Sequence, residues 1–180
     1  MVEIKVPIYF PLLLTHPSVE GTEKNNGDRT FFQSGVDALK SNGYILARTL
    51  FGQAINEAEQ KHDPVDRILA VSGYIASVRQ EPVADRSSGL AQQVETHRSS
   101  VEPLLADKEV PPVVKVLYYI ESGMYFDESG QTEKAKTSLS DASSLFKDID
   151  FNALRSEEAI QMHLALGLVE LTLGLLETKK

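Results

Sequence analysis

The feature that most constrains the fold is a helical period that begins at Phe31 and is interrupted by glycines inside the helices. Ser-Gly recurs at Ser34-Gly35, Ser72-Gly73 and Ser122-Gly123, and Leu166-Gly167 occupies the comparable place in the last helical segment. A glycine inside a helix costs about 0.5–1 kcal/mol relative to alanine. Close approach of a neighbouring helix is the usual compensation, so the recurrence predicts tightly packed helices.

The spacing of apolar residues predicts an all-α fold. Turn and capping residues support the boundaries: Asn42-Gly43 separates the first two helices, Asp63-Pro64 supplies an N-cap followed by proline at the first helical position, and Ser129-Gly130 supplies a turn. The expected helices cover residues 30–41, 44–61, 64–80, 84–101, 112–128, 132–147 and 156–177. Short connections between them predict antiparallel hairpins.

Two hairpins share an order of small and bulky residues. The first hairpin carries Phe31, Gly35, Ala38 and Asn42, then Ala47, Phe51 and Ala54. The third carries Tyr119, Gly123, Phe126 and Gly130, then Ala135, Leu139 and Ala142. This order resembles the tetratricopeptide repeat over residues 28–61 and 116–149. The resemblance implies a stacked α-solenoid of about three divergent hairpins plus a terminal helix, with Gly35 facing the helix of Ala47 and Gly123 facing the helix of Ala135.

The second hairpin departs from this order, keeping Leu69, Gly73 and Ala76 in its first helix. The fourth unit has Gly167 and Gly174 at the right separation but no second helix. A non-repetitive helical bundle is the alternative interpretation.

The segment before the helices has a different period. Ile4, Val6, Ile8 and Phe10 alternate with polar residues and prolines in residues 2–14, which indicates an extended chain with one apolar face. We therefore expect two regions: an extended apolar segment and loop at residues 1–29, and a helical repeat domain at residues 30–180. The extended segment is a candidate to lie against the helices near Val36, Tyr74 and Met124.

Composition excludes several classes of function. The net charge of -8 opposes binding to a nucleic-acid backbone, and the absence of cysteine removes disulfides, thiolate metal sites and cysteine nucleophiles. No stretch reads as a membrane span or a signal peptide, so we expect a soluble, intracellular and cytoplasmic protein. No nucleotide-binding or serine-nucleophile motif occurs. The sequence predicts neither an enzyme nor a bound cofactor or metal.

One alternative is a helical bundle with a metal site or an enzymatic activity. Glu59 and His62 have the Glu-x-x-His spacing of a di-iron ligand pair, which would indicate a metal-binding or enzymatic helical bundle. Such a site needs a second motif of this kind, and the chain has none. An exposed helix end is the simpler interpretation.

The resemblance implies a protein-interaction scaffold or adaptor, in which first helices line a concave groove for a partner segment. Carried over by position, the groove residues are Phe32, Val36, Leu39, Ala70, Tyr74, Ile120, Met124 and Asp127. Because Phe32 and Val36 stand where one subgroup has carboxylate-binding residues, the expected ligand is apolar or extended and not an anionic C-terminal carboxylate.

The last helix is apolar on every side, although a terminal helix of a repeat array normally has one polar face. Leu164, Leu168, Leu171 and Leu175 are candidates for an interface within residues 159–176. The expected occupant is a second copy of the chain, a continuation of the protein, or another protein. A permanent subunit of a larger complex is a further possibility with the same fold.

Overall fold

The computed structural model describes residues 30–82 and 89–178, and within these ranges the chain is all-helical, without strands. The α-helices are α1 (Phe31–Lys40), α2 (Tyr44–Lys61), α3 (Pro64–Gln80), α4 (Leu90–Val101), α5 (Pro112–Glu128), α6 (Thr132–Leu145) and α7 (Ser156–Thr178). Two short 3₁₀ segments, η3 (Glu102–Ala106) and η4 (Phe146–Asp148), follow α4 and α6. The extended segment predicted at residues 2–14 and the start of a helix expected at residue 84 lie outside the described residues.

Local chemistry explains where the helices begin and end. The side chain of Thr30 accepts a hydrogen bond from the backbone N–H of Gln33 at 3.2 Å, and Asp63 caps α3 by accepting from the N–H groups of two following residues. His62 and Gly130 have positive φ angles of 54° and 73° where α2 and α5 end. The seven helices predicted from the sequence are confirmed, with small shifts at their ends.

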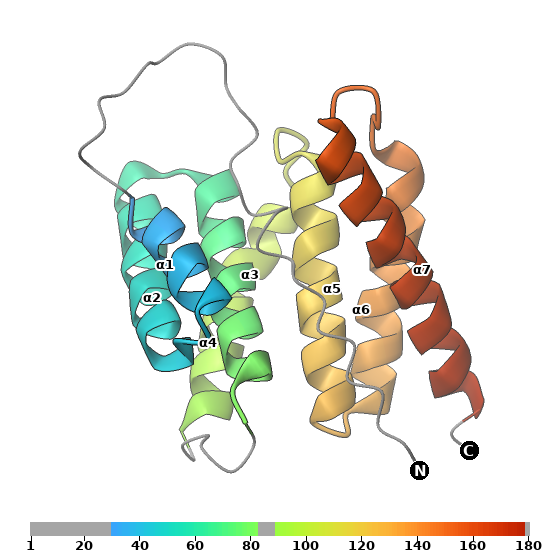
Figure 1. The fold of residues 1–180 in the computed structure, drawn as a ribbon, viewed down its shortest axis with the longest axis horizontal. Helices are drawn as coiled ribbons and strands as arrows, with labels where there is room; N and C mark the ends of the chain where they lie inside the picture. The colour runs from blue at the N-terminus through green and yellow to red at the C-terminus, as the bar shows by residue number, and fades with distance from the viewer. Residues whose placement is uncertain (1–29, 83–88, 179–180) are drawn as a thin grey trace.

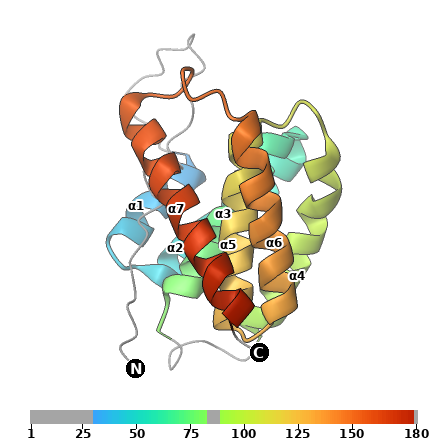
Figure 2. The same cartoon turned by 90° about the vertical axis from the view of Figure 1, so that its right-hand side faces the viewer.

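The helices stack side by side, with α1 and α2 at one end and α7 at the other (Figure 1). Each of α2, α3, α6 and α7 packs on the helix before it, and α3 also packs directly on α5. The helices α1, α3 and α5 therefore form a row in which α3 contacts both of the others. The helix α7 contacts α6 and lies on the outer side of the stack (Figure 2).

The ring of Phe51 fills the space that two glycines leave open. A Cβ atom on Gly35 of α1 would lie 2.9 Å from Cε1 of Phe51, and one on Gly73 of α3 would lie 2.5 Å from the same atom. Because real Cβ atoms essentially never approach so closely, a side chain at either position would force the Phe51 ring to shift. The prediction that Gly35 faces the helix of Ala47 is confirmed, since Phe51 belongs to that helix, α2.

A second close contact joins α5 to α6. A Cβ atom on Gly123 would lie 2.6 Å from Cγ of Leu139, which confirms that Gly123 faces the helix of Ala135. The same explanation is wrong for Gly167 and Gly174 in α7, because no atom of another helix lies within 4 Å of a Cβ built there. The α7 glycines therefore face open space and need a different account.

Candidate interaction surface

Five of the eight side chains assigned to a groove are core residues in this structure. Val36, Leu39, Ala70, Tyr74 and Ile120 are buried, whereas Phe32, Met124 and Asp127 are partly exposed. The physical reason is that α3 packs on α1, α2, α4 and α5 at once, so a residue in the middle of the row has neighbours on most sides. A partner cannot reach these five side chains in this conformation.

Tyr74 is buried, and both its hydroxyl group and its ring have partners on α4. Its hydroxyl group donates to Oε1 of Gln93 at 2.7 Å, and its ring lies 4.6 Å from the ring of His97 on α4. Burial raises the pKa of the Tyr74 hydroxyl, and burial lowers the pKa of His97 with a further contribution from Arg67. The tyrosine thus joins α3 to α4.

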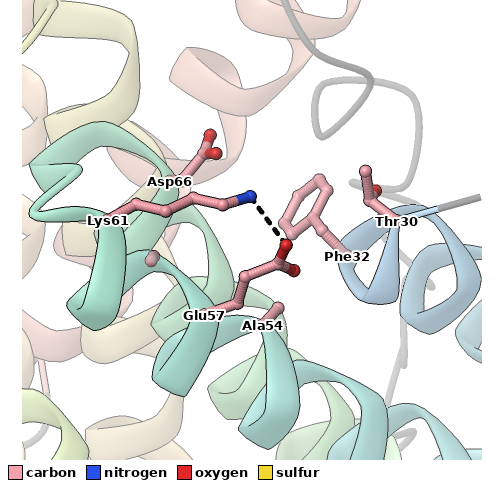
Figure 3. Close-up of a pocket in the computed structure, with 7 residues that line it drawn as sticks. Thr30, Phe32, Ala54, Glu57, Lys61 and Asp66 are labelled. Carbon is pink, nitrogen blue, oxygen red and sulfur yellow. Dashed lines mark hydrogen bonds and ion pairs between the residues drawn. The ribbon is translucent and has the colours of Figure 1, made fainter.

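A small pocket adjoins Phe32 at the end of the stack (Figure 3). It is lined by Thr30, Phe32, Ala54, Glu57, Ala58, Lys61 and Asp66. Across it, Nζ of Lys61 donates to Oε1 of Glu57 at 2.6 Å. The space of about 40 Å³ holds a few water molecules, so this pocket does not fit an organic ligand.

Glu59 and His62 are both exposed at the carboxyl-terminal end of α2. Oε1 of Glu59 lies 3.2 Å from Nη2 of Arg67, and His62 is the exposed residue at the end of α2. Across residues 30–82 and 89–178, no group of three His, Cys, Asp or Glu side chains is placed to hold a metal ion. The described geometry therefore gives the metal-binding alternative no support.

One face of α7 anchors the helix to the stack. Met162, Ala165, Val169, Thr172 and Leu176 are buried. The hydroxyl group of Thr172 lies 4.0 Å from Sδ of Met124 on α5, and Ser143 on α6 donates to Oε1 of Glu170 at 3.2 Å. The orientation of α7 is therefore fixed by its contacts with α5 and α6.

The opposite face of α7 is apolar and exposed, and no described helix lies in front of it in Figure 2. We call this surface the α7 stripe. Its large side chains are Ile160, Leu164, Leu171 and Leu175, which are 55–65% exposed, together with the partly exposed Leu168. Gly167 and Gly174 lie among them and are also exposed.

The α7 stripe contains all four leucines predicted for an interface, of which three are more than half exposed and Leu168 is partly exposed. Sequence reasoning took α7 to be apolar on all sides, and the structure shows which side is covered. Apolar side chains that remain this exposed on one contiguous helix face are typical of an interaction site.

The amino-terminal end of α7 is held by a charged cap. Glu158 accepts hydrogen bonds from the backbone N–H of Arg155 at 2.9 Å and from its side chain at 2.6 and 3.0 Å. The bond from the Arg155 side chain lowers the pKa of Glu158. This is the N3-to-N-cap half of a capping box, and it stabilises the first turn.

By length and composition alone, α7 is long and apolar enough to cross a membrane. The expectation that no stretch reaches this limit is wrong for α7, because Glu170 is the only Asp, Glu, Lys or Arg between Ala159 and Leu176. Core helices of globular proteins meet the same criterion.

Comparisons of the chain with models of protein families, with curated proteins and with solved structures find no match.

Sequence reasoning missed two features. Ile45 and Leu46 on α2 are large apolar side chains that remain exposed, at 66% and 58%. Arg79 on α3 and Glu121 on α5 form a buried ion pair. Arg79 and Glu121 are charged residues in largely apolar helices, and this pattern could have indicated a buried pair. No feature of the sequence indicated that Ile45 and Leu46 would be exposed.

Proposed function

We propose that this protein is a non-catalytic interaction scaffold, a divergent tetratricopeptide-like stack of hairpins that binds another polypeptide through the α7 stripe. The partner presents an apolar helix face. The hairpin stack is the rigid support, and recognition occurs on its outermost helix.

The packing of the first helices supports the repeat interpretation. In such repeats, small residues let helices touch and bulky residues fill the space between hairpins. The ring of Phe51, on the second helix of the first hairpin, lies against Gly35 of the same hairpin and Gly73 of the next. One side chain thus joins two successive units.

The observation that carries the proposal is the exposure of the α7 stripe on a helix whose other face is already anchored. Leu164, Leu171 and Leu175 are each more than half exposed, and the stripe carries no charged side chain. Burying one such leucine stabilises a complex by roughly 1.5–3 kcal/mol before the costs of association. The gain favours a partner that covers the whole face.

A helix is the partner element that fits best. The exposed residues recur every three or four positions along a straight helix, which is the arrangement that a second helix face contacts. Gly167 and Gly174 leave room for a close backbone approach.

Affinity capture from a native extract tests the proposal with a matched pair of variants. Leu171→Glu places a charge on the α7 stripe, whereas Leu46→Glu places the same charge at a residue of almost equal exposure on α2, 58% against 60%. We expect the wild type and Leu46→Glu to retain a common polypeptide that Leu171→Glu does not retain. Identical captured sets for all three proteins would overturn the proposed function.

A further inference from the structure

We infer that the polypeptide covering the α7 stripe is a second copy of this chain, with the two α7 helices packed antiparallel about a two-fold axis. This inference rests on the proposed function and names its partner. It is carried by the spacing of the exposed leucines, the apolar area they present, and the charge distribution along α7.

The leucine spacing matches that of a helix that packs against its like. Leu164, Leu168, Leu171 and Leu175 follow one another at intervals of four, three and four residues, which is the alternation of a heptad seam. With the axis between Leu168 and Leu171, Leu164 faces Leu175 of the second copy and Leu168 faces its Leu171. Every leucine of the seam then has an apolar counterpart, so the stripe is complementary to itself.

The glycines flank this seam on one side. Gly167 and Gly174 precede Leu168 and Leu175 by one residue each, and a Cβ atom at either position would meet no other helix. In the antiparallel pair they lie near each other across the axis, where their missing side chains let the two backbones approach. In such a dimer Gly167 and Gly174 would allow two helices to pack closely, as Gly35, Gly73 and Gly123 do within one chain.

The exposed area suits a modest dimer. The side chains of Ile160, Leu164, Leu171 and Leu175, at 55–65% exposure, present roughly 400 Å² of apolar surface, the size of the largest apolar patch on a typical monomer, which is often a functional surface. Pairing two stripes, with Leu168 and the rim included, buries roughly 1,000 Å², close to the lower limit for a specific interface. A dimer that dissociates in the micromolar range is therefore expected.

Charge decides the orientation. Glu157 is exposed in the first turn of α7, seven residues before Leu164 and so on the side of the seam, whereas Glu158 is buried. A parallel pair would bring the two copies of Glu157 together and align the two helix dipoles. An antiparallel pair places these acidic turns at opposite ends of the interface. Glu170 points to α6, where it accepts the hydrogen bond from Ser143, and does not enter the seam.

The anchored face of α7 disfavours a membrane as the occupant. Insertion across a bilayer would separate Met162, Val169 and Leu176 from the stack and carry Glu170 into hydrocarbon. Pairing with a second copy keeps α7 packed on the stack and leaves Glu170 outside the apolar seam.

Sedimentation velocity of the full chain tests the inference from roughly 1 to 100 µM, a range that brackets the micromolar dissociation constant expected for a weak dimer. We expect the wild type and Leu46→Glu to move from the 19.9 kDa chain mass towards twice that mass as concentration rises. We expect Leu171→Glu to weaken association by roughly 100-fold, since it buries an unpaired charge beside the axis. Equal melting temperatures for the two variants at the lowest concentration, where association contributes least to stability, show that Leu171→Glu remains folded.

Orientation is tested with single cysteines, because the chain has none of its own. A mixture of Leu164→Cys and Leu175→Cys is expected to form the mixed disulfide, while either variant alone forms far less. In the antiparallel pair, the two copies of position 175 are about 16 Å apart along the axis. Efficient self-crosslinking of each variant would show a parallel pair and overturn the antiparallel arrangement.

Three other results would overturn the second copy as partner. The first is a wild type that stays monomeric over the whole range. The second is a monomer that binds phosphatidylcholine vesicles and loses this binding in Leu171→Glu, which identifies a lipid surface. The third is a monomer in which a photo-crosslinker at position 171 reacts with residues 1–29 of its own chain. None of these three results decides the scaffold function, which the affinity capture described above tests separately.

Discussion

Nε of Arg79 on α3 donates to Oε2 of Glu121 on α5 at 3.1 Å, and the two side chains are 9% and 3% exposed. Nη1 of Arg79 also donates to the more exposed Glu128 at 3.1 Å. Burial raises the pKa of the Glu121 carboxyl group, and the Arg79 guanidinium acts in the opposite direction. This ion pair links α3, which packs on α1, α2 and α4, to α5, which packs on α6.

Breaking this ion pair from one side should be strongly destabilising. Arg79→Leu leaves Glu121 buried without its partner, so we expect the free energy of unfolding to fall by about 3–5 kcal/mol. Urea denaturation measures the loss. The double variant Arg79→Leu/Glu121→Leu removes both charges and should recover most of it. A single variant within about 0.5 kcal/mol of the wild type would show that the pair does not hold the α3–α5 junction.

Alanine at Gly73 should destabilise the protein although alanine favours helix. The added Cβ atom would lie 2.5 Å from Cε1 of Phe51, and the same ring atoms also lie close to Gly35, so the ring has little room to shift. We expect a loss of about 1–3 kcal/mol in thermal or urea unfolding. Gly52→Ala in the interior of α2 is the control, since its Cβ atom meets nothing within 4 Å and should raise stability by about 0.5–1 kcal/mol. Equal effects at the two positions would refute the close contact.

The positions of the helices and of three close contacts could be predicted from the sequence because both depend on local spacing. Helix ends follow from capping residues such as Asp63, and the need for glycine at Gly35, Gly73 and Gly123 follows from its cost inside a helix. Gly167 carries the same local signal but no contact, because which helix approaches it depends on packing that spacing does not encode.

The groove assignment failed to anticipate burial for a related reason. Exposure of Val36 or Ile120 is set by α2, α3, α5 and α6 together, which are distant in sequence. Likewise, Arg79 and Glu121 are 42 residues apart, and their pairing depends on the direct contact between α3 and α5. The leucines of the α7 stripe could be singled out from the sequence because a long helix with so few polar residues cannot bury every side within one hairpin stack.

Removing the α7 cap should have a pH-dependent effect. The folded-state pKa of Glu158 lies below its ordinary value, chiefly through the bond from Arg155. The carboxylate therefore contributes stability that is present above its unfolded-state pKa and is lost as the pH falls through the folded-state pKa. We expect Glu158→Ala to reduce stability at neutral pH by about 0.5–1 kcal/mol, with a difference from wild type that shrinks on acidification.

Urea denaturation at neutral and acid pH measures this, with Glu157→Ala as the control for a charge in the same turn. A Glu158→Ala difference that grows as the pH falls would contradict the account.

The metal-binding alternative gives an opposite expectation for Glu59 and His62. If these residues have no role in a site, Glu59→Ala/His62→Ala changes stability by no more than about 0.5–1 kcal/mol, since both residues are at the surface. The variant should also match the wild type in affinity capture. Stoichiometric zinc or iron in the purified wild type, absent from the variant, would restore the alternative.

Photo-crosslinking in cells tests the central claim most directly. A benzoylphenylalanine placed at position 171 reports what touches the α7 stripe, and the same probe at position 46 controls for an exposed apolar residue elsewhere. The proposed function predicts an adduct with a polypeptide, a second copy of this chain if the further inference holds, from position 171 and not from position 46. The absence of any intermolecular protein adduct at position 171, or identical adducts at both positions, would contradict it.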